Sequence, residues 1–231
     1  MDAKKTEKAS PTPAPPPVRK ARADGVESRR AILDAAARLA TTHGLEGLSI
    51  GDLARHIGMS KSGLYAHFKS KEELELATID TAVEIFENDV TRKIPDSLRG
   101  IARVTALSEA FFQHLQRRVY PGGCFFATVA AQLAPRPSPA RDRIMKLHGE
   151  WAAMFVAALR QACEDGEIQT DADLNQLVFE ITAMMFRANF AWIVTDDERV
   201  LDQARVGIRS ILSRIAKQTP PSGRAGKTKK Q

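Results

Sequence analysis

Hydroxyl, imidazole and amino groups are concentrated between residues 60 and 71 of the sequence. The set comprises Ser60, Lys61, Ser62, Tyr65, His67, Lys69 and Lys71, with Gly63 among them. Such groups hydrogen-bond or pair with phosphate oxygens and base edges, so their spacing favours contact with a nucleic acid. The alternative is that Tyr65 fills the core and the lysines form a solvated basic face.

Three helices joined by short connections are predicted around these side chains. Apolar residues recur every three or four positions and predict a helix over about 28–42. Ser49, three residues before Asp52, matches a capping pair and starts a second helix that reaches about Ile57. Ser60 can cap a short third helix. Two short helices separated by a tight turn form a helix-turn-helix pattern.

A small apolar core is expected to hold the two short helices together. Its members are Leu53, Ala54, Ile57, Leu64 and Phe68. With these packed inside, the polar side chains from Lys61 to His67 face outward. Ser60, Lys61 and Ser62 then occupy the positive N-terminal end of a helix, where anions are stabilised.

The stretch from Ser49 to Leu74, SIGDLARHIGMSKSGLYAHFKSKEEL, closely resembles the helix-turn-helix signature of the TetR family. The resemblance covers about residues 28–75, and the remainder is similar only in its helical architecture. It implies an all-α fold, in which an N-terminal three-helix helix-turn-helix DNA-binding domain is joined to a C-terminal helical bundle for ligand binding and dimerisation. It further implies a repressor that binds a palindromic operator in double-stranded DNA as a homodimer and is released by a small apolar molecule.

The resemblance also implies roles for single residues. Major-groove contacts correspond to Lys61, Ser62, Gly63, Tyr65 and His67, with Tyr65 and His67 on the DNA backbone. Lys71 corresponds to a phosphate clamp, and Ser49 can hydrogen-bond another phosphate. Glycine inside a helix costs about 1 kcal/mol relative to alanine, so Gly63 suggests a need for clearance at the groove. Ser60 and Lys69 complete the predicted DNA-binding set.

Beyond residue 70 the periodicity predicts an irregular helical bundle. The predicted helices cover about 71–93, 97–119, 123–133, 138–164, 171–195 and 198–217, and no strand pattern or fixed repeat competes with them. The chain is thereby divided into a disordered proline-rich basic arm (1–27), the helix-turn-helix domain (28–70), a ligand-binding and dimerisation domain (71–217) and a disordered basic tail (218–231).

The bundle is expected to supply a dimer interface and a ligand cavity. A dimer sets two recognition helices about 34 Å apart over a palindrome. We assign the interface to Leu174, Leu177, Val178, Ile181, Ile208, Ile211 and Leu212, with an intramolecular core as the alternative. We assign the cavity, for an unknown small-molecule ligand, to Phe112, Phe125, Trp151, Phe155, Met184, Asn189 and Phe190, with plain core packing as the alternative.

The charge distribution agrees with a polyanionic partner at one end of the molecule. Residues 28–71 carry a net charge of +4 and residues 217–231 carry +5, whereas residues 72–216 carry −5. Neutralised phosphates supply affinity that does not depend on base sequence. A nonspecific DNA-packaging protein without a ligand is therefore an alternative, and salt-sensitive binding with no operator preference would distinguish it.

Enzyme and cofactor chemistry has little support in the sequence. The five histidines are scattered, and neither a glycine-rich phosphate loop nor metal-ligand spacing is present, so we predict no catalytic site, no cofactor and no metal. The segment 120–126 resembles a Gly-Cys-apolar turn of TetR-like proteins, which favours a structural role for Cys124 over a reactive thiol. Two cysteines, no signal peptide and no uninterrupted apolar run predict a cytoplasmic protein with no membrane partner.

Overall fold

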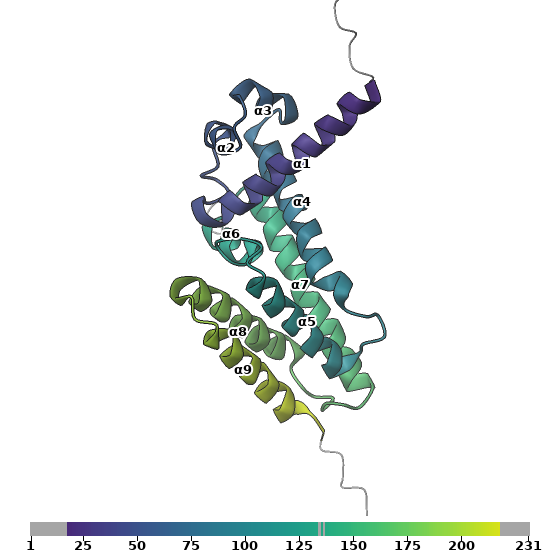
Figure 1. Cartoon of the computed structure of the whole chain (residues 1–231). Helices are drawn as coiled ribbons and strands as arrows, with labels where there is room; N and C mark the ends of the chain where they lie inside the picture. Colours follow the sequence, from purple (N-terminus) through teal and green to yellow (C-terminus); the bar gives the residue numbers. More distant parts are fainter. Residues whose placement is uncertain (1–17, 134, 136, 218–231) are drawn as a thin grey trace, which may run out of the picture.

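The computed structural model describes residues 18–133, 135 and 137–217, and over this part of the chain it contains helices and no strands (Figure 1). The helices are α1 (Val18–His43), α2 (Ile50–His56), α3 (Lys61–His67), α4 (Lys71–Asp89), the 3-10 turn η1 (Thr91–Lys93), α5 (Gly100–Gln116), α6 (Phe125–Leu133), α7 (Pro139–Glu164), α8 (Leu174–Thr195) and α9 (Arg199–Ile215). The first three helices form one end, α4 and α7 run from it into the body, and α8 and α9 pair at the far side. The predicted all-α fold is confirmed.

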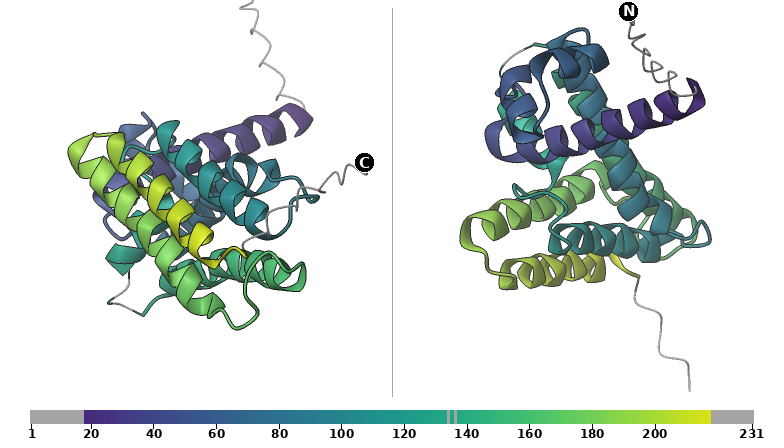
Figure 2. Two further views of the ribbon diagram at one scale, coloured as in Figure 1. Left: turned by 90° about the horizontal axis from the view of Figure 1, so that it is seen from below. Right: turned by 45° about the horizontal axis from the view of Figure 1, so that its top comes forward.

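Helix α1 is longer than predicted, because it begins at Val18 rather than near Ser28. Its first turns project past the body of the molecule (Figure 2). No proline follows Pro17 in this segment, and residues 19–23 are Arg, Lys, Ala, Arg and Ala, all of which favour a helix. The prediction of a disordered arm is thus wrong for residues 18–27. Residues 1–17 and the predicted tail, 218–231, lie outside the described residues.

Serine caps begin α2, α3 and α4, and those of Ser49 and Ser60 are as predicted. The hydroxyl oxygens of Ser49, Ser60 and Ser70 each accept a hydrogen bond from the backbone N–H three residues later, at 3.0 Å in all three cases. Each cap satisfies one of the unpaired donors of a first helical turn, so these short helices have defined starts.

The first hydrophobic cluster joins the helix-turn-helix to the body. Leu53, Leu64 and Phe68 are fully buried in it, as predicted, but so are Phe125 of α6 and Ile144 of α7. The core of the DNA-binding end is therefore completed by helices that follow it by more than fifty residues in sequence. The predicted domain boundary at residue 70 does not coincide with a gap in packing.

The second cluster contains the residues that we assigned to the dimer interface. Leu177, Val178, Ile181, Ile208, Ile211 and Leu212 are buried within the single chain, and Leu174 packs partly buried against them. They face α5 and α7, on which α8 and α9 pack. The prediction of a dimer interface is therefore wrong for these six buried residues, because helical periodicity marks a buried face without saying whether the covering helix belongs to the same chain.

Helix α8 is long and apolar enough to cross a membrane by length and composition alone, a test that a core helix can also pass. Glu180 and Arg187 interrupt its apolar run, which is why the sequence shows no continuous span. Of its most apolar window, 44% is buried inside the molecule, where one face of α8 belongs to the second cluster.

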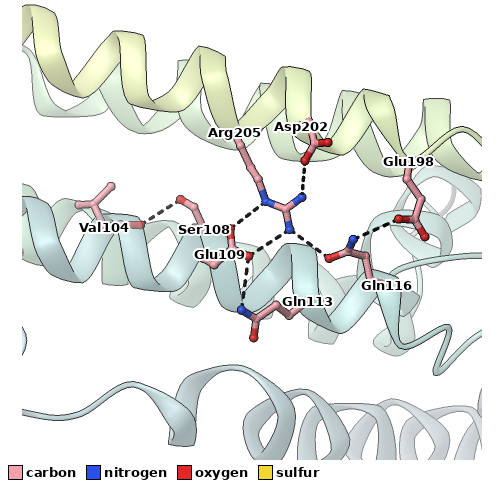
Figure 3. Close-up of polar contacts among 8 residues, drawn as sticks. All are labelled: Val104, Ser108, Glu109, Gln113, Gln116, Glu198, Asp202 and Arg205. Carbon is pink, nitrogen blue, oxygen red and sulfur yellow. Dashed lines mark hydrogen bonds and ion pairs between the residues drawn. The ribbon is translucent and has the colours of Figure 1, made fainter.

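Polar contacts centred on Arg205 tie α9 to α5 (Figure 3). The Arg205 guanidinium donates two hydrogen bonds to the Glu109 carboxylate, at 2.8 and 3.0 Å, one to Gln116 at 3.1 Å and one to Asp202 at 2.9 Å. Its guanidinium carbon lies 5.1 Å from the centre of the Phe112 ring. This half-buried network fixes the position of α9 on the body.

Candidate DNA interface and ligand cavity

Helix α3 presents a polar face to solvent and an apolar face to the core. Leu64 and the following Phe68 are fully buried, whereas Lys61, Ser62 and Tyr65 are exposed. Tyr65 is 55% exposed and stands among the large side chains that contact solvent. The alternative in which Tyr65 fills the core is therefore excluded, and the outward orientation predicted for these three residues is observed.

His67 holds α3 against α1 and is only partly exposed. Its Nε2 lies 3.3 Å from the Ser28 hydroxyl, and its backbone carbonyl accepts a hydrogen bond from Arg29. Arg29 also stacks over the Phe68 ring at 4.2 Å and pairs with Glu73 at 3.6 Å. Arg29 was missing from the predicted set, since its role depends on the packing of α1 across α3.

Lys71 and Ser49 already have partners within the chain. The Lys71 ammonium donates to the Glu46 carbonyl oxygen and lies 3.6 Å from a Glu75 carboxylate oxygen. The Ser49 hydroxyl donates to Asp52 at 2.6 Å, and this hydrogen bond is the leading cause that lowers the pKa of Asp52. Any phosphate contact from Lys71 or Ser49 has to share or replace these interactions.

Gly63 and Lys69 occupy distinct positions around the α3 face. A Cβ on Gly63 would lie 3.2 Å from the Ser60 hydroxyl that caps the helix. Close packing within the protein therefore favours glycine here, in addition to the predicted clearance for DNA. The Lys69 side chain is exposed, while its backbone N–H donates to Glu73 at 2.9 Å.

A cavity of about 180 Å³ lies among α4, α5, α6, α7 and α8. Its lining consists of Val83, Phe86, Glu87, Thr91, Phe111, Cys124, Phe126, Leu147, His148, Glu150, Trp151, Met154 and Phe186. For comparison, an engineered protein cavity of about 150 Å³ holds benzene. The space is thus large enough for a small organic molecule.

Only Trp151 of the seven predicted ligand residues lines this cavity. Phe112 is buried under Arg205, Phe125 belongs to the first cluster, and Phe155 is buried against Trp151 with ring centres 5.1 Å apart. These three assignments are therefore wrong, because a fully packed ring fills space and leaves none for a ligand.

The other three predicted ligand residues lie on α8, outside the cavity. Met184 covers Gly207 of α9, at which any Cβ would lie 2.6 Å from the Met184 sulfur. Phe190 is 63% exposed, and Asn189 is buried with its side-chain oxygen accepting the Cys124 N–H at 2.8 Å. None of them lines the cavity between α4 and α7.

The turn before α6 joins the DNA-binding end to α8. The Gly122 N–H donates to the Thr41 hydroxyl at 3.2 Å, and a Cβ on Gly122 would lie only 2.0 Å from the Thr41 carbonyl oxygen. Gly123 has φ of +79° and leaves room for Asn189 of α8. The turn therefore permits close contact among α1, α6 and α8.

Cys124 follows this turn as a buried, protonated thiol. Burial raises the pKa of Cys124 to about 11, which leaves the thiolate scarce near neutral pH. This environment argues against the reactive-thiol alternative. Among the residues that the structure describes, no group of three or more His, Cys, Asp or Glu side chains is placed to hold a metal ion.

Two family profiles match most of the described chain. The profile for bacterial regulatory proteins of the tetR family matches residues 32–78, and that for the tetracyclin repressor-like C-terminal domain matches residues 100–208. The transcriptional repressor ComR of Escherichia coli is 27% identical over 163 residues, which cover 66% of this chain and 73% of ComR.

Solved structures of regulators have the same fold. A TetR transcriptional regulator from Chloroflexus aurantiacus superposes with a TM-score of 0.77 at 24% identity, covering 84% of this chain and 98% of that one. AibR, in complex with isovaleryl coenzyme A and operator DNA, superposes with a TM-score of 0.65 at 24% identity and covers 81% of this chain and 97% of its own. The chain therefore belongs to the TetR family, whose members regulate transcription and are not enzymes.

Proposed function

We propose that the chain is a ligand-responsive repressor that binds a palindromic operator as a homodimer and leaves it when a small, largely apolar molecule binds. The observation that carries the proposal is the α3 face, on which Lys61, Ser62 and Tyr65 are exposed above the buried Leu64 and Phe68. A rigid helix with hydrogen-bond donors on one side suits base edges and phosphates in a major groove. The repressor ComR, and AibR with its operator DNA, support this proposal by similarity.

The exposed apolar face of α8 and α9 is the surface that we propose for dimerisation. Phe179, Phe190, Val194 and Val206 are all more than half exposed, and a groove of about 520 Å³ runs between the two helices. Contiguous apolar surface of this kind marks interaction sites on soluble proteins. This surface replaces the buried residues that the sequence had suggested.

We propose that the cavity signals to the DNA-binding end through the turn before α6. Cys124 and Phe126 line the cavity, while the adjacent Gly122 contacts the end of α1. Asn189 links the same turn to α8, which carries the proposed dimer surface. A ligand that prefers one arrangement of these helices would change the spacing of the two recognition helices. A DNA-binding role of this kind also agrees with the expected cytoplasmic location.

Selection from a random DNA pool at moderate salt, followed by sequencing, tests the proposal. A dimeric protein that recognises a base sequence enriches a palindrome from the pool, whereas a nonspecific DNA-packaging protein enriches no sequence. Lys61→Ala is then compared on the enriched site with Arg160→Ala, which removes the same charge from the exposed surface of α7. If Lys61 contacts a phosphate, only its variant lowers the slope of log K against log salt, by about one. Equal slopes for both variants, or an unenriched pool, would contradict the proposal.

A further inference from the structure

We infer that the cavity between α4 and α7 accepts a small organic cation, such as a quaternary ammonium compound, rather than an anion or a neutral hydrocarbon. The inference rests on the proposed ligand-sensing function and specifies the chemical class of the ligand. It follows from two properties of the lining, namely its aromatic rings and the sign of its charges.

Five aromatic rings from five different helices surround the space. They are Phe86, Phe111, Phe126, Trp151 and Phe186. The Phe86 ring is nearly perpendicular to Trp151, at 83° and 5.2 Å between centres, and to Phe126, at 85° and 5.5 Å. Rings at right angles bound a space on more than one side. The face of an aromatic ring carries negative electrostatic potential, so such a lining attracts alkylammonium groups.

The formal charges of the lining are all negative. Glu87 and Glu150 line the cavity, and no lysine or arginine does so among the described residues. The ion-pair partners of these carboxylates lie outside the lining: Arg92 is 2.8 Å from Glu87, and Lys146 is 3.8 Å from Glu150. The partner side chains are the more exposed members of each pair, at 61% and 68% against 43% and 55% for Glu87 and Glu150, so solvent screens the positive charges more than the negative ones.

The remaining polar groups of the lining do not supply a lysine or arginine charge that would bind an anion. Cys124 is held as the neutral thiol, the Thr91 hydroxyl donates to the Glu87 carbonyl oxygen at 3.4 Å, and the His148 Nε2 lies 3.3 Å from the Phe126 carbonyl oxygen. A carboxylate or phosphate in the cavity would meet two glutamates without a lysine or arginine to balance its charge. A neutral hydrocarbon would fit the rings but would leave both carboxylates without a role in recognition.

Two probes of equal shape separate these possibilities. Benzyltrimethylammonium carries a positive charge on nitrogen, and neopentylbenzene has carbon at the same position. Binding of each is measured by isothermal titration calorimetry with the full chain, the Glu87→Gln/Glu150→Gln double variant and a control, Glu72→Gln/Glu164→Gln. The control removes two exposed carboxylates from the same helices, α4 and α7, outside the cavity lining.

The inference predicts that the Glu87/Glu150 double variant binds benzyltrimethylammonium about tenfold more weakly than the unmodified chain, since two attractive charges are lost. Its affinity for neopentylbenzene and the affinities of the control variant should change by less than about twofold. Binding of neopentylbenzene alone, or equal weakening in both double variants, would overturn the cation inference and leave the proposed cavity in place. Failure of both probes to bind would overturn the cation inference and also remove the cavity's proposed role in sensing.

Discussion

Replacing Arg205 by alanine should destabilise the chain more than replacing any fully exposed arginine. Arg205 is the centre of the network between α9 and α5, and its side chain is only 16% exposed. It makes a two-pronged contact with Glu109, and its stem and guanidinium cover Phe112. Such a fork-shaped contact fixes orientation as well as distance, so its loss should loosen α9 from the body.

The size of the effect follows from the exposure of the partners. A buried hydrogen bond to a charged group contributes about 1.5–3 kcal/mol, whereas an exposed ion pair contributes about 0.2–1 kcal/mol. Glu109 is 41% exposed, so we take about 1 kcal/mol for the screened contact. Lost packing over Phe112 adds about 1 kcal/mol. The expected decrease in the free energy of unfolding is therefore about 2 kcal/mol.

Urea denaturation at one fixed protein concentration measures this change, because association would make stability depend on concentration. Arg199→Ala is the matched control, since Arg199 lies on the same helix, pairs with Asp197 and is 85% exposed. Arg205→Lys keeps the charge but not the fork, and should recover only a minor part of the loss. A decrease for Arg205→Ala no larger than that for Arg199→Ala would refute the reasoning.

Three further predictions concern the turn, a buried histidine and the two cysteines. Gly122→Ala forces backbone apart at Thr41 and should lower the free energy of unfolding by about 2 kcal/mol or more, as thermal denaturation would measure. Burial lowers the pKa of His114 in the folded chain below the usual histidine pKa of about 6.5. Between these two pKa values the unfolded chain binds more protons than the folded chain. The contribution of His114 to the free energy of unfolding should thus be complete above a pH of about 6.5 and decrease as the pH falls. In urea titrations, the free energy of unfolding of His114→Gln should depend less on pH. In alkylation followed by mass spectrometry, the partly exposed Cys163 should react well before the buried Cys124, and equal rates would contradict the burial.

The helix-turn-helix was predictable because its signals are local. The serine caps depend on neighbours within a few residues, and the spacing of Leu64 and Phe68 marks the inward face of α3 and therefore the outward direction of Tyr65. The contacts of Lys71 with the loop before α2 were not predictable, since the lysine and Glu46 are 25 residues apart and only the folded chain brings them together.

The ligand cavity was largely missed for a different reason. Phe112, Phe125 and Phe155 were assigned to the cavity for their aromatic side chains, and the structure shows the alternative, plain core packing. A cavity, however, is the space that packed side chains fail to fill, and it depends on how five helices cross. No pattern along one helix reports that quantity, so of the seven assigned residues only Trp151 lines the cavity.

The first hydrophobic cluster limits how DNA specificity can be exchanged between relatives. Phe125 and Ile144 lie in the same cluster as Leu64 and Phe68, with α6 packed on α1 and α7 packed on α4, so residues 28–70 grafted alone onto another body would meet a foreign surface at their core. A chimera made at that boundary should expose apolar surface and aggregate. DNA specificity should transfer to a relative more readily by exchanging side chains on the outer face of α3. It should also transfer when α1–α3 are moved together with α4, α6 and the first turns of α7. The DNA-binding end and the helices that pack on it are in this respect one folding unit rather than interchangeable modules.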